Sequence, residues 1–176
     1  MQLEGMRVGM LLAEGVEDLE YWVVLMRLQE EGARVTTIGL ALDSITGKNG
    51  LQATPDVLAT DITPDGFDGL VIPGGWAPDK LRRHRSITDL VRTIHDAGKP
   101  IGIICHGGLV AISAGIVSGE RATGSLGIKD DLVNAGATWV DEPAFREGTH
   151  AWGRVVADIP AFNRELVALF AEHHRG

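Results

Sequence analysis

Continuous apolar runs recur along the first hundred residues, and stretches with helical spacing separate them. The runs are Met6–Ala13, Val35–Leu40, Phe67–Pro73 and Ile101–Ile104. Short apolar runs without alternation are typical of strands that are buried on both faces, as in a parallel sheet. We therefore predict an α/β fold in which helices cover both faces of a mainly parallel sheet.

The segments between these runs predict helices. Leu19–Glu31 carries apolar residues at near-helical spacing, and Gly32 follows it as a C-terminal stop. Pro160 opens the last helix in a position that proline favours. The other predicted elements are helices over Asp79–Ala97, Leu109–Ile112, Leu132–Ala135 and Pro160–Phe170, and β structure over Thr138–Val140 and Ala144–Val156.

A turn signal interrupts this alternation between residues 43 and 63. Asn49-Gly50 lies between Ile45 and Leu51, and an Asn-Gly pair favours the tight turn of a hairpin. We expect a small β-ribbon that protrudes from the sheet.

Composition limits the classes of function. A chain of 176 residues with 44% hydrophobic residues is sufficient for one domain, residues 1–176, with a single core. The net charge of −8 argues against nucleic acid and anionic membranes as partners. The basic run Lys80–Arg85 is interpreted as a solvated helix face or a subunit contact. Val8–Ala13 is too short for a signal or a membrane span, so we expect a cytoplasmic protein.

Cys105 is the only cysteine, and it follows the run Ile101–Ile104 directly. A side chain at a strand-to-helix turn lies at the carboxyl edge of the sheet, beside free helix N–H groups that lower the pKa of a thiol. His106 and the small Gly107-Gly108 strengthen this interpretation over a merely structural cysteine. Gly74-Gly75 ends a neighbouring strand and could supply an N–H group to a developing oxyanion. We expect neither a metal site nor a cofactor.

Four carboxylates, Glu14, Glu17, Asp18 and Glu20, crowd the loop after the first strand and the start of its helix. Acidic residues are common in the first helical turn because of the helix dipole, so most of these should be solvated. One of them is expected near Cys105 if the first strand ends beside the central one.

The order of several motifs resembles the PfpI family, which includes intracellular cysteine protease I proteins and parkinsonism-associated deglycases. The resemblance covers nearly the whole chain. It implies a class I glutamine amidotransferase-like fold, a flavodoxin-like three-layer α/β/α sandwich. The motifs are Ile72-Pro-Gly-Gly75, Ala77-Pro-Asp79, Gly98-Lys-Pro100, Ile104-Cys-His-Gly107, Ile112-Ser-Ala-Gly115, Gly127-Ile-Lys-Asp-Asp131, Asn134-Ala-Gly136 and Trp139-Val-Asp141.

The resemblance also implies roles for individual residues. Cys105 matches the nucleophile, His106 the histidine beside it, and Glu20 a protonated glutamate that hydrogen-bonds the thiol. The backbone N–H groups of Gly75 and His106 match the oxyanion site, with Gly74 and Gly107 adjacent. Asp79 matches an acidic residue that orients the histidine of a neighbouring subunit, so a homodimer or larger homo-oligomer is expected.

The chain departs from the family pattern around the expected pocket. The departures are at Val24, Gly108, Ser125 and Trp152–Val155, within which Arg154 is retained as a candidate substrate-binding residue. The nucleophile is therefore better supported than the substrate.

The function predicted first is a cysteine-dependent hydrolase or lyase acting on a small carbonyl substrate, as a glyoxalase or deglycase does, with a role in stress protection. Two alternatives remain open. One is an intracellular cysteine peptidase that is active as an oligomer on peptides. The other is a non-catalytic protein, either a redox-responsive stress protein with an oxidisable cysteine or a binding module.

Overall fold

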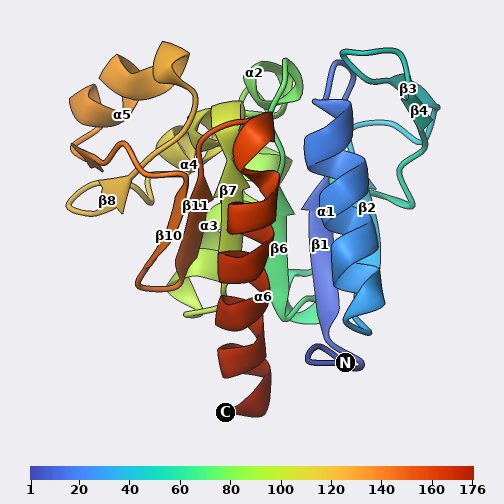
Figure 1. Cartoon of the computed structure of the whole chain (residues 1–176). Helices are drawn as coiled ribbons and strands as arrows, with labels where there is room; N and C mark the ends of the chain where they lie inside the picture. Colours follow the sequence, from blue (N-terminus) through green and yellow to red (C-terminus); the bar gives the residue numbers. More distant parts are fainter.

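Seven strands form one sheet in the computed structural model, which describes all 176 residues (Figure 1). The order across the sheet is β10-β11-β7-β6-β1-β2-β5, and every neighbouring pair is parallel except β10 with β11. The predicted mainly parallel sheet is confirmed. Its strands are β1 (Arg7–Leu11), β2 (Arg34–Gly39), β5 (Val57–Leu58), β6 (Gly69–Ile72), β7 (Ile101–Ile104), β10 (Ala144–Glu147) and β11 (His150–Gly153).

Helices cover both faces of this sheet and give the three-layer sandwich. Two of them, α1 (Asp18–Glu30) and α6 (Ile159–Arg175), lie side by side on one face, as Figure 1 shows. The opposite face carries α3 (Arg85–Asp96) and α4 (Gly108–Ser113). The short helices α2 (Ala77–Leu81) and α5 (Lys129–Asn134) lie toward the carboxyl ends of the parallel strands.

Two small strand pairs lie outside the main sheet. The antiparallel pair β3 (Ile45–Thr46) and β4 (Gln52–Ala53) is the predicted ribbon, which is confirmed. The parallel pair is β8 (Arg121–Ala122) with β9 (Thr138–Trp139). Five single 3₁₀ turns complete the structure, at Ala59–Asp61, Pro64–Gly66, Cys105–Gly107, Leu126–Ile128 and Val156–Asp158.

The prediction of a single helix over Asp79–Ala97 is wrong, because the segment forms two helices, α2 and α3. Leu81 and Ile87 are both fully buried, yet six residues of a straight helix would turn them about 120° apart. The extended backbone of His84 changes the direction of the chain between the two helices, so that the side chains of Leu81 and Ile87 can both reach the core. The last helix begins at Ile159 and runs to Arg175, further than predicted.

Helix α6 lies unusually close to β7 and β11 because two glycines face it. A Cβ atom on Gly102 would lie 2.4 Å from Leu166 Cδ1, and one on Gly153 would lie 2.9 Å from Phe162 Cδ2. The buried apolar side chains of both layers form one connected cluster of 48 residues. This packing fixes β7, and with it the turn that follows at Cys105. No helix in the structure is both long enough and apolar enough to cross a bilayer.

Truncation of Phe162 tests this packing. Phe162 is a fully buried residue of α6 that packs onto the sheet at Gly153, so Phe162→Ala should lower the free energy of unfolding by about 3–5 kcal/mol. Urea denaturation followed by circular dichroism measures the change. Arg164→Ala on the exposed side of the same helix should stay within about 0.5 kcal/mol of the parent. Equal effects of the two substitutions would contradict the proposed packing.

Candidate active site

Cys105 occupies the turn between β7 and α4, as the sequence predicts. Its φ is +58°, and it is the only residue other than glycine with a positive φ. A left-handed conformation at a residue with a Cβ atom costs on the order of 1–3 kcal/mol, and such strain is found mainly at functional sites. The thiol is only partly buried, so it faces the surface of the molecule at the carboxyl edge of the sheet.

The loop after β6 presses against this turn from the neighbouring strand. A Cβ atom on Gly74 would lie 2.8 Å from Cys105 Cβ and 2.7 Å from Glu20 Oε1, so only glycine fits between them. Gly75 has a φ of +79°. The backbone N–H groups of Gly75 and His106 lie at the thiol and act to lower the pKa of Cys105. Two backbone donors at one thiol are suited to hold an oxyanion that forms on an attacked carbonyl.

The His106 ring lies against the thiol. Its Nδ1 is 3.3 Å from Cys105 Sγ. Burial, and secondarily the nearby ammonium of Lys48, lowers the pKa of His106 below its ordinary value. The ring is therefore neutral at pH 7, and Nδ1 is available to accept the thiol proton.

Glu20, at the start of the first helix, is the predicted carboxylate beside the thiol, but the expected adjacency of the first strand and β7 is wrong. β6 separates β1 from β7, so β1 does not end beside the central strand. Glu20 instead reaches the site from the first turn of α1. Its side chain is fully buried, and neither oxygen has a hydrogen-bond partner with normal geometry. Burial, followed by the charge on Glu17, raises the pKa of Glu20 to about 8, so the carboxyl is protonated at neutral pH.

The N–H groups at the turn lower the thiol pKa as expected, but the expectation that the pKa of Cys105 is lowered overall is wrong. Burial, followed by the negative charge on Glu20, raises the pKa of Cys105 to about 12, and the N–H groups of His106 and Gly75 oppose this only partly. The contribution of Glu20 applies only while that carboxyl is ionised. Because Glu20 is protonated at pH 7, this contribution is absent there, and burial remains the main cause. The resting thiol is therefore neutral at pH 7.

The expectation that the loop carboxylates are mostly solvated is also wrong, since Glu17 and Asp18 are buried. Asp18 accepts hydrogen bonds from the backbone N–H groups of Asn49 (2.6 Å) and Leu51 (2.9 Å). Glu17 accepts one from Asn49 Nδ2 at 3.0 Å. These bonds hold the β3–β4 ribbon against the start of α1.

The ribbon brings Lys48 to the site, which the sequence analysis did not predict. Its Nζ lies 3.6 Å from Glu17 Oε2, and its backbone N–H donates to Val16 O. The hairpin signal at Asn49-Gly50 predicts a ribbon, but nothing in the sequence indicates which element the ribbon contacts. Lys48 could be found only after the carboxylates were known to be buried and therefore in need of partners.

A cavity of about 400 Å³ opens over the thiol. Among the positions that depart from the family pattern, Ser125 and Val155 line it, whereas Val24 and Trp152 are fully buried in the core. Trp76 stands exposed at the cavity wall. The lining residues are Glu17, Lys48, Gly75, Trp76, Cys105, His106, Ser125, Val155, Val156 and Ala157.

Five predicted site residues lie outside this lining. Glu20 and Gly74 are buried directly behind the thiol, and the other three are Asp79, Arg154 and Gly107. Asp79 is exposed on α2 and pairs with Arg83 of the same helix. The Arg154 guanidinium pairs with Asp141 and Asp158, each at 2.9 Å. Gly107 packs under the turn, where a Cβ atom would lie 2.4 Å from Ile72 O. The roles of Asp79, Arg154 and Gly107 in catalysis or binding stay predictions.

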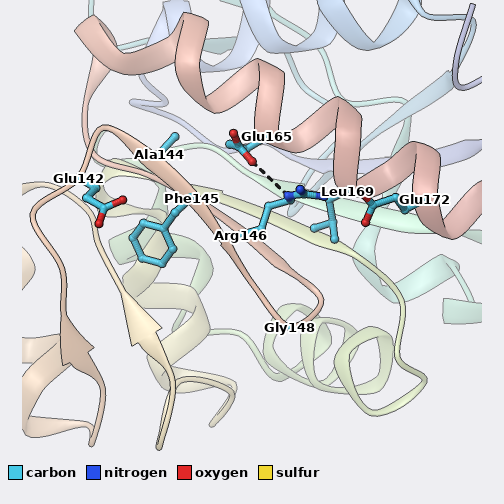
Figure 2. Close-up of a pocket in the computed structure, with 8 residues that line it drawn as sticks. All are labelled: Glu142, Ala144, Phe145, Arg146, Gly148, Glu165, Leu169 and Glu172. Carbon is cyan, nitrogen blue, oxygen red and sulfur yellow. Dashed lines mark hydrogen bonds and ion pairs between the residues drawn. The ribbon is translucent and has the colours of Figure 1, made fainter.

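A larger cavity, of about 610 Å³, lies away from the thiol between β10 and α6. Figure 2 shows Arg146 reaching from β10 toward Glu165 on α6, and Arg146 also pairs with Glu172. The walls of this larger cavity carry no cysteine or histidine, so the smaller cavity over Cys105 is the candidate active site. No group of three or more His, Cys, Asp or Glu side chains is arranged to hold a metal ion.

The pH dependence of the free energy of unfolding tests the protonation state of Glu20. An acid whose pKa is raised by folding favours the folded state at low pH, and this stability is lost as pH rises from about 4.5 to about 8. Glu20→Gln does not titrate, so it should be more stable than the parent by up to about 3 kcal/mol at pH 7 and by little below pH 4.5. Urea denaturation at several pH values measures this. Glu142→Gln, at an exposed carboxyl, should follow the parent, and a constant difference at all pH values would refute a protonated Glu20.

Hydrogen exchange tests the anchoring of the ribbon. Asp18→Ala removes the acceptor of two backbone N–H groups, and bonds to charged groups contribute about 1.5–3 kcal/mol. The amides of Asn49 and Leu51 should exchange about 10- to 100-fold faster. Asp43→Ala, at an exposed residue before the ribbon, should leave both rates unchanged. Unchanged exchange in Asp18→Ala would show that other contacts hold the ribbon.

Comparisons with known proteins identify the family of this chain. The model of the DJ-1/PfpI family matches residues 6–169. The chain is 40% identical to a deglycase of Pyrococcus abyssi, over 93% of this chain and 99% of the relative. It is 34% identical to a Bacillus subtilis protein named as a candidate cysteine protease, over 93% of this chain and 97% of the relative.

A solved structure shows the same fold. Drosophila melanogaster DJ-1beta superposes with a TM-score of 0.88 at 25% identity, covering 97% of this chain and 94% of that one. The resemblance found in the sequence motifs is thereby confirmed, and this chain belongs to the DJ-1/PfpI family.

Proposed function

We propose that this protein is a cysteine-dependent enzyme of the glyoxalase or deglycase type, with Cys105 as the nucleophile on a small carbonyl substrate. One observation carries the proposal: Cys105 Sγ lies 3.3 Å from His106 Nδ1 under a cavity of about 400 Å³, and the backbone N–H groups of Gly75 and His106 lower the pKa of this thiol. The arrangement places a base, a nucleophile and an oxyanion site around one carbonyl carbon. The name of the Pyrococcus abyssi relative agrees with this chemistry.

The first step suits a thiol that is neutral at rest. As Sγ bonds to the aldehyde carbon of a 2-oxoaldehyde, the thiol proton passes to His106 Nδ1 and then to the new oxygen, which gives a hemithioacetal. The N–H groups of Gly75 and His106 stabilise the negative charge on that oxygen while it forms. Glu20, protonated, donates toward the sulfur and so stabilises any thiolate.

The remaining steps are redox-neutral. A proton moves from the hemithioacetal carbon to the adjacent ketone carbon through an enediol, which leaves a 2-hydroxy thioester. Water then cleaves the C–S bond, releasing a 2-hydroxy acid and restoring the thiol. If the aldehyde carbon first carries an amine as a hemiaminal, attack by the thiol releases that amine and the same steps follow. The same residues therefore suit both a free aldehyde and its amine adduct.

Peptide hydrolysis is less well supported by the geometry. An amide leaving group must be protonated, and a histidine in that role is normally oriented by a carboxylate. Within this chain no carboxylate is bonded to His106, and Asp79 is paired with Arg83. Completion of a triad by Asp79 of a second copy in a homo-oligomer stays a prediction.

Lactate formation from methylglyoxal tests the proposed function. The protein should produce lactate, and Cys105→Ala should reduce kcat by about 10³-fold or more because the nucleophile is lost. His106→Ala should lower kcat by about 10²- to 10⁴-fold. Chiral chromatography of lactate gives the rate, and Ser113→Ala, away from the lining of the cavity, serves as a control.

The amine adduct of methylglyoxal with N-acetyllysine is assayed in parallel. Release of free N-acetyllysine with lactate would favour deglycation over action on the free aldehyde. Absence of lactate from both substrates, with Cys105 reduced and the protein folded, would overturn the proposal. A clean gain of two oxygens at Cys105 under mild peroxide would then favour the redox-responsive alternative.

A further inference from the structure

Two carboxyl side chains at the start of α1 are buried, and the charge on Glu17 acts on Glu20. Glu17 is the N-cap of the helix, and Glu20 lies three residues later. Residues at these positions commonly form a capping box, in which the later carboxylate accepts the N-cap N–H. Here the N–H of Glu17 donates to Gly74 O at 3.1 Å instead. Glu20 is therefore released from capping and lies against Cys105.

The partners of the two carboxyls are unequal. Glu17 accepts hydrogen bonds from Asn49 Nδ2 (3.0 Å) and from the N–H of Leu19 (3.4 Å), and its Oε2 lies 3.6 Å from Lys48 Nζ. Glu20 has no partner of normal geometry at either oxygen. Two buried carboxylates three residues apart at the start of one helix do not both ionise at neutral pH when a single cation faces them. The proton must lie on the carboxyl without partners, which is Glu20.

We propose that Glu17 is a positioning residue that keeps the shared proton on Glu20, and that it thereby controls the reactivity of Cys105 without touching the sulfur. The proposal builds on the proposed function only in taking Cys105 as the reacting group. With Glu20 protonated, its O–H can donate to a thiolate. With Glu20 ionised, its charge opposes thiolate formation.

The other charged and titratable groups around Glu20 have defined partners. Asp18 is directed away, toward the ribbon amides of Asn49 and Leu51. His106 is held neutral by burial and by Lys48. Lys48 is thus the only cation that faces the pair, and its charge acts on Glu20 in the direction opposite to that of Glu17. The ribbon that carries Lys48 and Asn49 therefore takes part in setting the protonation of the site.

The pH profile of thiol alkylation tests this proposal. The rate of Cys105 alkylation by iodoacetamide should rise with pH and level off near pH 8, where Glu20 ionises. In Glu17→Gln, Glu20 should ionise at lower pH, so the rate should level off earlier and fall about tenfold at pH 7, with little change at pH 5. In Lys48→Met, the alkylation rate should level off at higher pH, because the charge that lowers the pKa of Glu20 is lost.

The two substitutions remove the same Glu17–Lys48 ion pair, so a merely structural role predicts shifts in the same direction. Opposite shifts, with Glu17→Asp close to the parent, support the proposal. Overlapping profiles for Glu17→Gln and the parent, or shifts in the same direction, overturn it. If Glu17→Gln does not fold, Lys48→Met at the exposed ribbon carries the test alone, and no shift or a shift to lower pH refutes the proposal.

Alkylation does not depend on turnover, so it separates this proposal from the proposed function. Opposite shifts without any lactate would refute the enzyme and retain the control by Glu17. Lactate formation with unchanged pH profiles of alkylation would support the enzyme and refute the control by Glu17. The C=O stretch of a protonated carboxyl in the infrared spectrum, lost in Glu20→Gln and weakened at pH 7 in Glu17→Gln, provides a second readout.

Discussion

The left-handed backbone of Cys105 is the constraint around which the site is arranged. A strained turn of this kind persists only where its neighbours leave no other conformation. A Cβ atom on Gly74 would clash with the turn from the β6 side, and one on Gly124 would lie 2.6 Å from Cys105 O on the other side. β7 itself is held by α6, which packs closely over Gly102. The core of the sheet thus supplies the rigidity that fixes the nucleophile.

The electrostatics of the site follow from burial rather than from a helix terminus. Burial keeps the thiol and the imidazole neutral and keeps Glu20 protonated. Folding must therefore bury a carboxyl that prefers water, which lowers stability at neutral pH. Residues in active sites commonly lower the stability of the fold while they increase its reactivity. What results is a thiol that is neutral at pH 7.

Most of the fold could be predicted from the sequence, because uninterrupted apolar runs such as Ile101–Ile104 indicate buried parallel strands directly. Cys105, His106 and the glycines after β6 could be predicted because the ends of neighbouring parallel strands meet at one edge of the sheet. The break between α2 and α3 could not, because helical periodicity continues on both sides of it and only the common burial of Leu81 and Ile87 requires the turn.

The contact between the ribbon and the start of α1 lay beyond prediction for a different reason. An acidic residue in a first helical turn has the same sequence signature whether it is solvated or buried. Its burial depends on whether a distant segment supplies donors, and here Asn49 and Lys48 come from about thirty residues away. The charge of Glu17 therefore has two roles: it anchors the ribbon through Asn49, and it leaves Glu20 as the one carboxyl able to keep a proton beside the thiol. The charge of Glu17 can act on Glu20 in this way because both side chains are buried, where water screens charges poorly.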